Sequence, residues 1–194
     1  IEELIVGETA YLILQNGDVF SGRRFGAAGD ITAELVFTTA MTGYLETLTD
    51  PSYHGQMVMQ TFPLIGNYGV IPEDFESPQP RLSAYIVREI CSEPANFRNQ
   101  CKLDDYLHRA GIIGLEQVDT RTLTKIIREY GVMNAAIVSE LPADLPVFVA
   151  KLSQEKLGSD VYQVSSSAPQ VLNESGQPHV VLWDFGYKRG MATE

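Results

Sequence analysis

Two amphipathic segments, each followed by a short apolar run, constrain the fold of this chain more than any other feature. Both segments carry apolar residues at the i, i+3, i+4, i+7 spacing of a helix with one apolar face: Leu103, Tyr106, Leu107 and Ala110 in the first, and Leu123, Ile126, Ile127 and Tyr130 in the second. Gly111 and Gly131 stand where C-terminal caps belong, and Asp119 or Thr120 can cap the second start. The runs 112–115 and 135–138 are predicted strands. Since such helices need a sheet to cover, we predict a mixed α/β domain over residues 8–152.

The remaining elements of this domain follow from local patterns. Residues 11–25 form a predicted hairpin around the tight-turn dipeptide Asn16-Gly17. Three further segments have strand character and one has helical character: strands 34–39, 57–62 and 84–87, and a helix over 146–157. Because Pro51 is unsuited to a central strand and holds Asp50 extended, we predict an ordered loop over 41–53. The acidic, proline-rich segment 72–80 is predicted to be an exposed loop.

The C-terminal part has a different composition. Residues 153–178, rich in Ser, Pro, Gln and Asn from 165 onwards, are a predicted linker. The apolar run 179–186 that follows is typical of a buried parallel strand in an α/β domain. The residues after it are too few for such a domain. We therefore expect 179–194 to be the start of a truncated second domain, whose first strand is disordered, pairs with a neighbouring molecule or joins the main sheet.

Charge and composition exclude several classes of protein. The formal net charge of −11 disfavours binding to a nucleic acid backbone. No apolar run is long enough to span a membrane, and the first residues lack the pattern of a signal peptide. The two cysteines, Cys91 and Cys101, are too few for a disulfide framework and fit no zinc spacing, so we expect free thiols in a cytoplasmic protein.

The search for chemistry finds no catalytic set and no metal site. The three histidines (His54, His108 and His179) have no partner at metal-ligand spacing, and no phosphate-binding glycine loop occurs. The pair Arg23-Arg24 is predicted to lie on a solvated face. The segment 41–53 offers hydroxyls, a carboxylate and a restrained backbone, which suits a polar small molecule or a docking surface. Turns held by their own Asp, Ser and Thr side chains remain the alternative.

Four blocks of this sequence resemble the small subunit of carbamoyl-phosphate synthase. They are Leu35–Glu46 with Leu48–Tyr53, Pro63–Gly69, Asp119–Arg128, and Asp184–Phe185–Gly186 with Lys188–Arg189, with Ala95–Arg98 between the second and the third. They occur in the order of that family and extend over most of the chain.

The resemblance implies a layered β/β/α domain of the swivelling type, followed by the first strand of a class I glutamine amidotransferase domain. That second domain releases ammonia from glutamine with a Cys-His-Glu triad. The ammonia passes to a large subunit, which binds ATP and Mg²⁺ and makes carbamoyl phosphate for pyrimidine and arginine synthesis. This chain contains neither the nucleophile segment nor the His-x-Glu element, so we expect it to be inactive alone and to need no cofactor of its own.

One site residue follows from the resemblance. The serine of the family's D-P-S-Y element contributes to the glutamine site, and the matching residue is Ser52. Its hydroxyl is expected to position the substrate. The implied role of the chain is a docking and scaffold module for the large subunit and its own glutaminase domain. A free-standing domain that binds a small polar ligand is the alternative, and a cysteine hydrolase using Cys91 or Cys101 is the weakest hypothesis.

Overall fold

The strands of the domain close into a barrel. The computed structural model describes residues 8–155, 161–172 and 180–193. Within these residues seven strands pair in the order β1-β2-β8-β6-β4-β3-β9. Their bounds are Thr9–Leu14 (β1), Val19–Gly26 (β2), Ile31–Thr38 (β3), Gln56–Gln60 (β4), Ala84–Ile86 (β6), Ile113–Glu116 (β8) and Met133–Val138 (β9). A separate parallel pair joins β5 (Leu64–Ile65) to β7 (Glu89–Ile90).

The barrel has an antiparallel half and a parallel half. The predicted hairpin is formed by β1 and β2, and β9 pairs antiparallel with both β1 and β3. On the other half, β3 pairs parallel with β4, β4 with β6, and β6 with β8. The α/β class predicted from the helix–strand alternation is therefore confirmed, with a mixed sheet.

The barrel interior is the main core. Alternate residues of six of the described barrel strands point inward, among them Leu12, Leu35, Met57, Ile86 and Ile137, and β2 adds the partly buried Phe20. Helix α3 (Thr120–Tyr130) adds Leu123 and Ile127 to this interior. These two residues belong to the predicted apolar face, and Asp119 caps the helix by accepting a hydrogen bond from Thr122 N at 3.0 Å. The amphipathic pattern thus supplies a side of the barrel core.

The other helices cover the outside of the barrel. Helix α1 (Tyr44–Thr49) lies over the parallel half and α2 (Leu103–Ala110) over β2 and β8, and their Leu48 and Leu107 share a cluster with Val58 and Tyr85. Gly111 ends α2 with a φ of 74°, as predicted. Helix α4 (Leu145–Leu152) covers β1 and β9 on the antiparallel half and is shorter than the predicted 146–157. Residues 156 and 157 lie outside the described part.

Three local predictions are wrong. The segment 41–53 contains α1 and a 3-10 helix, η1 (Pro51–Tyr53), where a loop was expected. The segment 72–80 is not simply exposed, since it contains a 3-10 turn, η2 (Pro72–Asp74), and Ser77 is buried and donates to Thr49 O at 2.6 Å. The Arg23-Arg24 pair is not a solvated face either, because each side chain has a fixed acidic partner.

The two arginines link β2 to residues elsewhere in the chain. Arg23 Nη2 lies 2.5 Å from the carboxylate of Glu116, which is buried on β8. Arg24 is itself buried and donates to Gly29 O, to Asp30 at 3.2 Å and to Ser139 Oγ at 3.1 Å. Sequence spacing did not reveal these partners because Glu116 and Ser139 are far from the pair along the chain.

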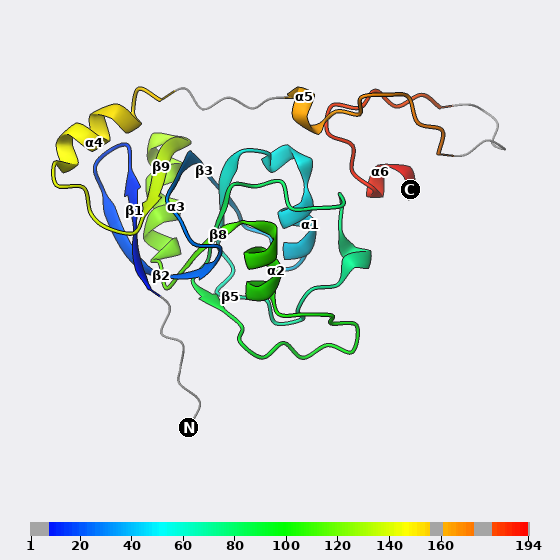
Figure 1. The fold of residues 1–194 in the computed structure, drawn as a ribbon, viewed down its shortest axis with the longest axis horizontal. Coiled ribbons are helices and arrows are strands. Elements are labelled where there is room, and N and C mark those ends of the chain that lie inside the picture. The colour runs from blue at the N-terminus through cyan, green and yellow to red at the C-terminus, as the bar shows by residue number, and fades with distance from the viewer. Residues whose placement is uncertain (1–7, 156–160, 173–179, 194) are drawn as a thin grey trace.

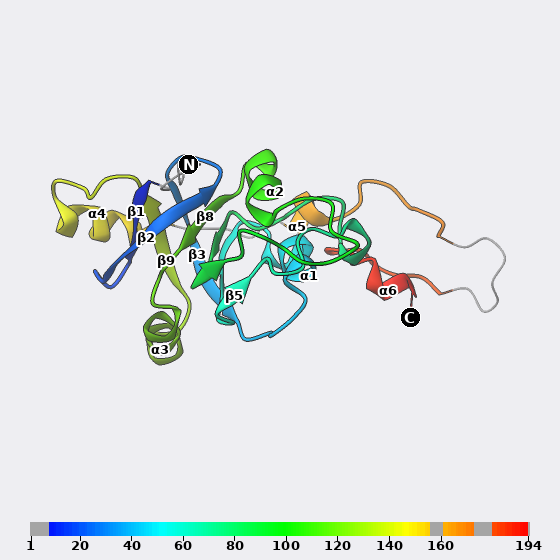
Figure 2. The ribbon, with the colours of Figure 1, turned by 90° about the horizontal axis from the view of Figure 1, so that it is seen from below.

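The C-terminal segments lie beyond α1, on the side of the domain opposite α4 (Figures 1 and 2). They contain the short helices α5 (Val161–Val164) and α6 (Gly190–Thr193). The predicted strand is not formed, since residues 180–184 are extended without a sheet partner and most of them are exposed. Its residue 179 and the predicted linker positions 156–160 and 173–178 lie outside the described residues.

Candidate functional site

The D-P-S-Y element lies in a turn that begins where α1 ends. Asp50 is extended, with a φ of −69° and a ψ of 118°, as predicted from Pro51. Pro51 is buried and opens η1, where its fixed φ suits a first helical position. Asp50 Oδ1 accepts a hydrogen bond from Ser52 N at 2.9 Å. The turn is therefore fixed by its own residues, and Ser52 lies exposed at its surface.

Two stacked tyrosines fix the start of α1. The N-cap of α1 is Gly43, with a φ of 78° and no side-chain cap. Tyr68 Oη supplies the acceptor, taking hydrogen bonds from Gly43 N at 3.2 Å and Tyr44 N at 3.1 Å. The Tyr44 and Tyr68 rings stack with centroids 4.1 Å apart, and Tyr44 Oη donates to Gly69 O at 2.5 Å. Burial, and then the neighbouring Tyr68, raise the pKa of Tyr44 well above its usual range.

Acidic side chains gather beside this turn. Burial raises the pKa of Glu46 above its ordinary value, and Asp74 and Glu76 add to the shift. Glu46 Oε2 has no hydrogen-bond partner among the described residues. Asp74 is paired with Arg98 at 3.0 Å. Glu46, Asp74 and Glu76 are therefore close enough to one another for their charges to interact.

The segment 184–190 contacts the Ser52 turn directly. Lys188 Nζ lies 3.1 Å from Asp50 Oδ2. Gly186 fits against Pro51, since a Cβ on Gly186 would lie 3.3 Å from Pro51 Cβ. Arg189 N of the same segment donates to Glu76 O at 2.9 Å, in the segment 72–80.

This segment has a local structure of its own. Asp184 Oδ1 accepts from Gly186 N at 2.8 Å and from Tyr187 N at 2.7 Å, and Oδ2 accepts from Ser166. The hydrogen bond from the Ser166 hydroxyl is the main cause that lowers the pKa of the Asp184 carboxyl. Because Asp184 holds the backbone bend at Gly186, Lys188 is directed back toward Asp50.

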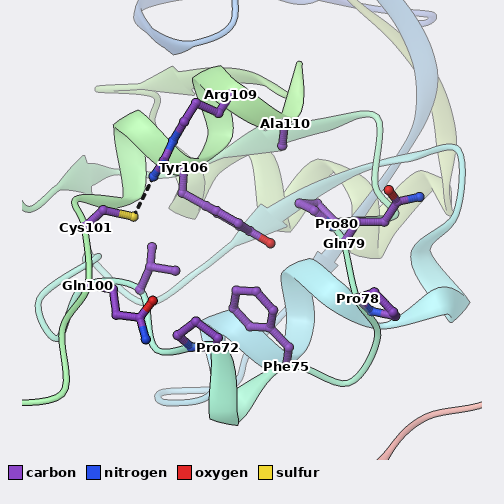
Figure 3. Close-up of a pocket in the computed structure, with 11 residues that line it drawn as sticks. Pro72, Phe75, Pro78, Gln79, Pro80, Gln100, Cys101, Tyr106, Arg109 and Ala110 are labelled. Carbon is purple, nitrogen blue, oxygen red and sulfur yellow. Dashed lines mark hydrogen bonds between the residues drawn. The ribbon is translucent and has the colours of Figure 1, made fainter.

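A separate groove of about 400 Å³ lies between α2 and the 72–80 segment (Figure 3). Two of its polar side chains come from α2: Arg109 Nη2 donates to Cys101 Sγ at 2.9 Å, and the Tyr106 hydroxyl points into the groove. That hydroxyl has no partner among the described residues, and burial raises the pKa of Tyr106 to about 12. Phe75 packs on Tyr106 with centroids 5.3 Å apart. The groove does not include Ser52, so it is distinct from the turn.

The structure brings together three of the four sequence blocks. Tyr68 of the second block caps the helix of the first, and Lys188 of the fourth pairs with Asp50 of the first. The third block forms α3, whose apolar residues fill the barrel instead of approaching Ser52. Tyr68 and Lys188 were not assigned roles from the sequence, and only their membership of the blocks pointed to them.

The other predicted features have the following places. Cys91 and Cys101 are half-buried free thiols. His54 lies near the turn, with Nε2 2.9 Å from Gln163 Oε1, and His108 is exposed on α2. Among the described residues, no cluster of three His, Cys, Asp or Glu side chains has the arrangement of a metal site. None of the described helices is long and apolar enough to cross a membrane.

Comparisons with known proteins identify the family. Residues 12–137 match the family model of the carbamoyl-phosphate synthase small chain, CPSase domain. The carbamoyl phosphate synthase small chain of Bacillus cereus is 46% identical over 94% of this chain and 50% of its own length. That of Syntrophotalea carbinolica is 43% identical over 94% of this chain and 53% of its own. The chain thus spans about half the length of the curated relatives it matches, and it belongs to the carbamoyl-phosphate synthase small chain family.

Proposed function

We propose that this chain is the N-terminal part of the small subunit of a glutamine-dependent carbamoyl-phosphate synthase, and that Ser52 forms part of its glutamine pocket. In this role the domain is a scaffold. It presents the Ser52 hydroxyl to a substrate whose hydrolysis is carried out by groups of the following glutaminase domain. Glutamine is then the small-molecule ligand, and ammonia passes from it to the large subunit, where ATP and Mg²⁺ bind.

The observation that carries this proposal is the contact between the Ser52 turn and segment 184–190. Ser52 is exposed, while the residue before it is buried and Asp50 is paired with Lys188 at 3.1 Å. An exposed hydroxyl on a rigid turn can donate to or accept from the polar groups of a bound amino acid. Its position beside a second segment of the chain suits a pocket that is closed from two sides.

The arrangement of layers supports a domain of the swivelling β/β/α type. The barrel core lies between the antiparallel and parallel halves, and α1 and α2 form a third layer on the outside of the barrel. We also propose that residues 179–194 are the beginning of the class I amidotransferase domain. The run 180–184 would then form the first strand of that domain once the neighbouring strands of its sheet are present.

Exposed apolar side chains support docking on a large subunit. Phe97 is 98% exposed, although its loop is fixed by Ala95 N, which donates to Asn67 O at 3.0 Å, and by the Arg98–Asp74 ion pair. Met41 is 73% exposed. Rigidly presented aromatic side chains of this kind are common anchors in protein interfaces. Such a complex would operate in the cytoplasm.

The test is Ser52→Ala in the full-length small subunit, assayed together with the large subunit. We expect glutamine-dependent synthesis to fall about 3- to 10-fold, the effect of losing one typical hydrogen bond to the substrate. Ammonia-dependent synthesis should be unchanged, because it bypasses the glutamine pocket. Ser21→Ala, on an exposed position of β2, is the matched control. An equal loss with glutamine and with ammonia would refute the assignment of Ser52.

A further inference from the structure

The groove between α2 and the 72–80 segment is separate from the proposed glutamine pocket, and the fold fixes both of its walls. On one wall, α2 is anchored to the domain by the buried Leu107. On the other, the buried Ser77 donates to a backbone carbonyl at the end of α1 at 2.6 Å. The backbone of Val70, which also lines the groove, donates to Cys101 O at 3.0 Å. The groove is therefore preformed, and its volume of about 400 Å³ is that of a site for a small molecule.

Most of the lining of this groove is apolar, and much of it consists of rings. The Phe75 ring packs on Tyr106 of α2 with the centroids 5.3 Å apart, and three proline rings lie around them. The apolar lining residues, apart from the Tyr106 ring, are Val70, Pro72, Phe75, Pro78, Pro80 and Ala110. Ring surfaces of this kind pack well against another flat apolar group. The groove therefore suits a ligand with a small, flat, apolar body.

Arg109 carries the only charge among the described residues that line the groove. Its guanidinium donates to Asp105 O at 3.1 Å and to Cys101 Sγ at 2.9 Å, which are both uncharged acceptors. Within the described part of the chain it forms no ion pair. A guanidinium has five N–H donors in a planar arrangement that matches a carboxylate. The end of the groove beside Arg109 therefore favours a carboxylate group.

A second polar group of the groove is the Tyr106 hydroxyl. It points away from the Arg109 guanidinium, toward residues 78–80 (Figure 3), and its buried oxygen has no partner among the described residues. Burial raises the pKa of Tyr106 to about 12, so the hydroxyl stays protonated at neutral pH and can donate a hydrogen bond. Buried polar groups are generally hydrogen-bonded. Because Pro78 and Gln79 beside it are exposed, they can move aside for an acceptor without disturbing the core.

We propose that this groove is a binding site for a small aromatic carboxylate that has a hydrogen-bond acceptor at the end opposite its acid group. The carboxylate binds Arg109, the ring packs on Phe75 and the prolines, and the acceptor takes the hydrogen bond of Tyr106. Arg109 and Tyr106 are three positions apart on α2, so one helix sets the distance between the two ends of the ligand. The inference does not depend on the role of Ser52.

The experiment uses the full-length small subunit together with its large subunit and the probe para-hydroxybenzoate. Benzoate lacks the distal acceptor, and para-hydroxybenzamide lacks the negative charge. Calorimetry gives the dissociation constants of all three for the parent, Arg109→Met and Tyr106→Phe. The matched controls are Arg128→Met and Tyr130→Phe, which remove the same groups from exposed positions in the last turn of α3.

We expect para-hydroxybenzoate to bind saturably, and about 3- to 10-fold more tightly than either analogue. Arg109→Met should remove the advantage over para-hydroxybenzamide, and Tyr106→Phe the advantage over benzoate, because each variant deletes the group that distinguishes the two ligands. The control variants should bind like the parent. In peptide mass spectrometry after alkylation, para-hydroxybenzoate should slow the modification of Cys101, which lines the groove, but not that of Cys91.

Three results would overturn the inference. One is the absence of saturable binding to the assembled enzyme. Another is binding that neither Arg109→Met nor Tyr106→Phe weakens, and the third is binding that leaves the alkylation of Cys101 unchanged, since the ligand would then lie elsewhere. If either variant fails to fold, as judged by urea titration, the protection of Cys101 in the parent decides the outcome.

Discussion

Removing one hydroxyl group, by Tyr68→Phe, should loosen the start of α1. The phenolic oxygen of Tyr68 is the acceptor for Gly43 N at 3.2 Å and Tyr44 N at 3.1 Å, and α1 has no side-chain cap of its own. Phenylalanine keeps the ring that stacks on Tyr44 at 4.1 Å, so the substitution isolates the two hydrogen bonds.

The size of the effect follows from those two bonds. A typical hydrogen bond contributes about 0.5–1.5 kcal/mol, and Tyr68 is half-buried, so water can replace part of the loss. We therefore expect the free energy of unfolding to fall by about 1–2 kcal/mol, and the melting temperature by about 2–8 °C. Amide hydrogen exchange at Gly43 and Tyr44 should accelerate more than exchange in the barrel strands.

Urea titration and hydrogen exchange measure these changes. Tyr130→Phe is the control, because Tyr130 is 66% exposed at the end of α3. If Tyr68→Phe stays within about 0.5 kcal/mol of this control, and exchange at Gly43 and Tyr44 is unchanged, the capping argument is refuted.

Three further predictions concern the barrel and the Glu46 carboxyl group. A Cβ on Gly22 would lie 2.6 Å from Glu116 O, so Gly22→Ala should lower the free energy of unfolding by about 1–3 kcal/mol in urea titration, whereas Ser21→Ala should not. Arg23→Met leaves the 3% exposed Glu116 side chain without its cationic partner and should cost about 1–3 kcal/mol, part of which Glu116→Gln in the same chain should restore; no recovery would contradict this. Burial raises the pKa of Glu46 above 4.5, so the ionised carboxylate destabilises the fold at higher pH. Glu46→Gln should therefore be more stable than the parent at pH 8, and the difference should vanish as the pH falls below 4.5; a difference independent of pH would refute this.

The predictability of the fold depended on how local each signal was. Helices α2 and α3 were predicted because their apolar spacing and caps lie within their own residues: Gly111 ends α2, and Asp119 caps α3. Helix α1 was missed for the opposite reason. Its cap is Tyr68, which lies 24 residues beyond Tyr44, and its six residues are too few to show a clear period.

Local sequence patterns also could not predict that the strands close into a barrel. Its strand order joins β2 to β8 and β9 to β1, and these pairings depend on contacts across most of the chain. The extended run 180–184 shows the converse error. Its apolar residues have strand propensity, but propensity alone does not form a strand where the described residues provide no sheet partner.

The candidate site combines both kinds of information. Ser52 was identified from the family resemblance, and the extended conformation of Asp50 from the proline that follows it. Neither the resemblance nor the proline could reveal that the Asp50 carboxylate also pairs with Lys188, 138 residues away. Asp50→Ala should therefore damage the site more than Asp50→Asn, because alanine removes both the local bond to Ser52 N and the distant one to Lys188. If the two variants had equal KM values for glutamine, the local bond would contribute nothing, and the orientation of the turn would depend on the distant pair alone.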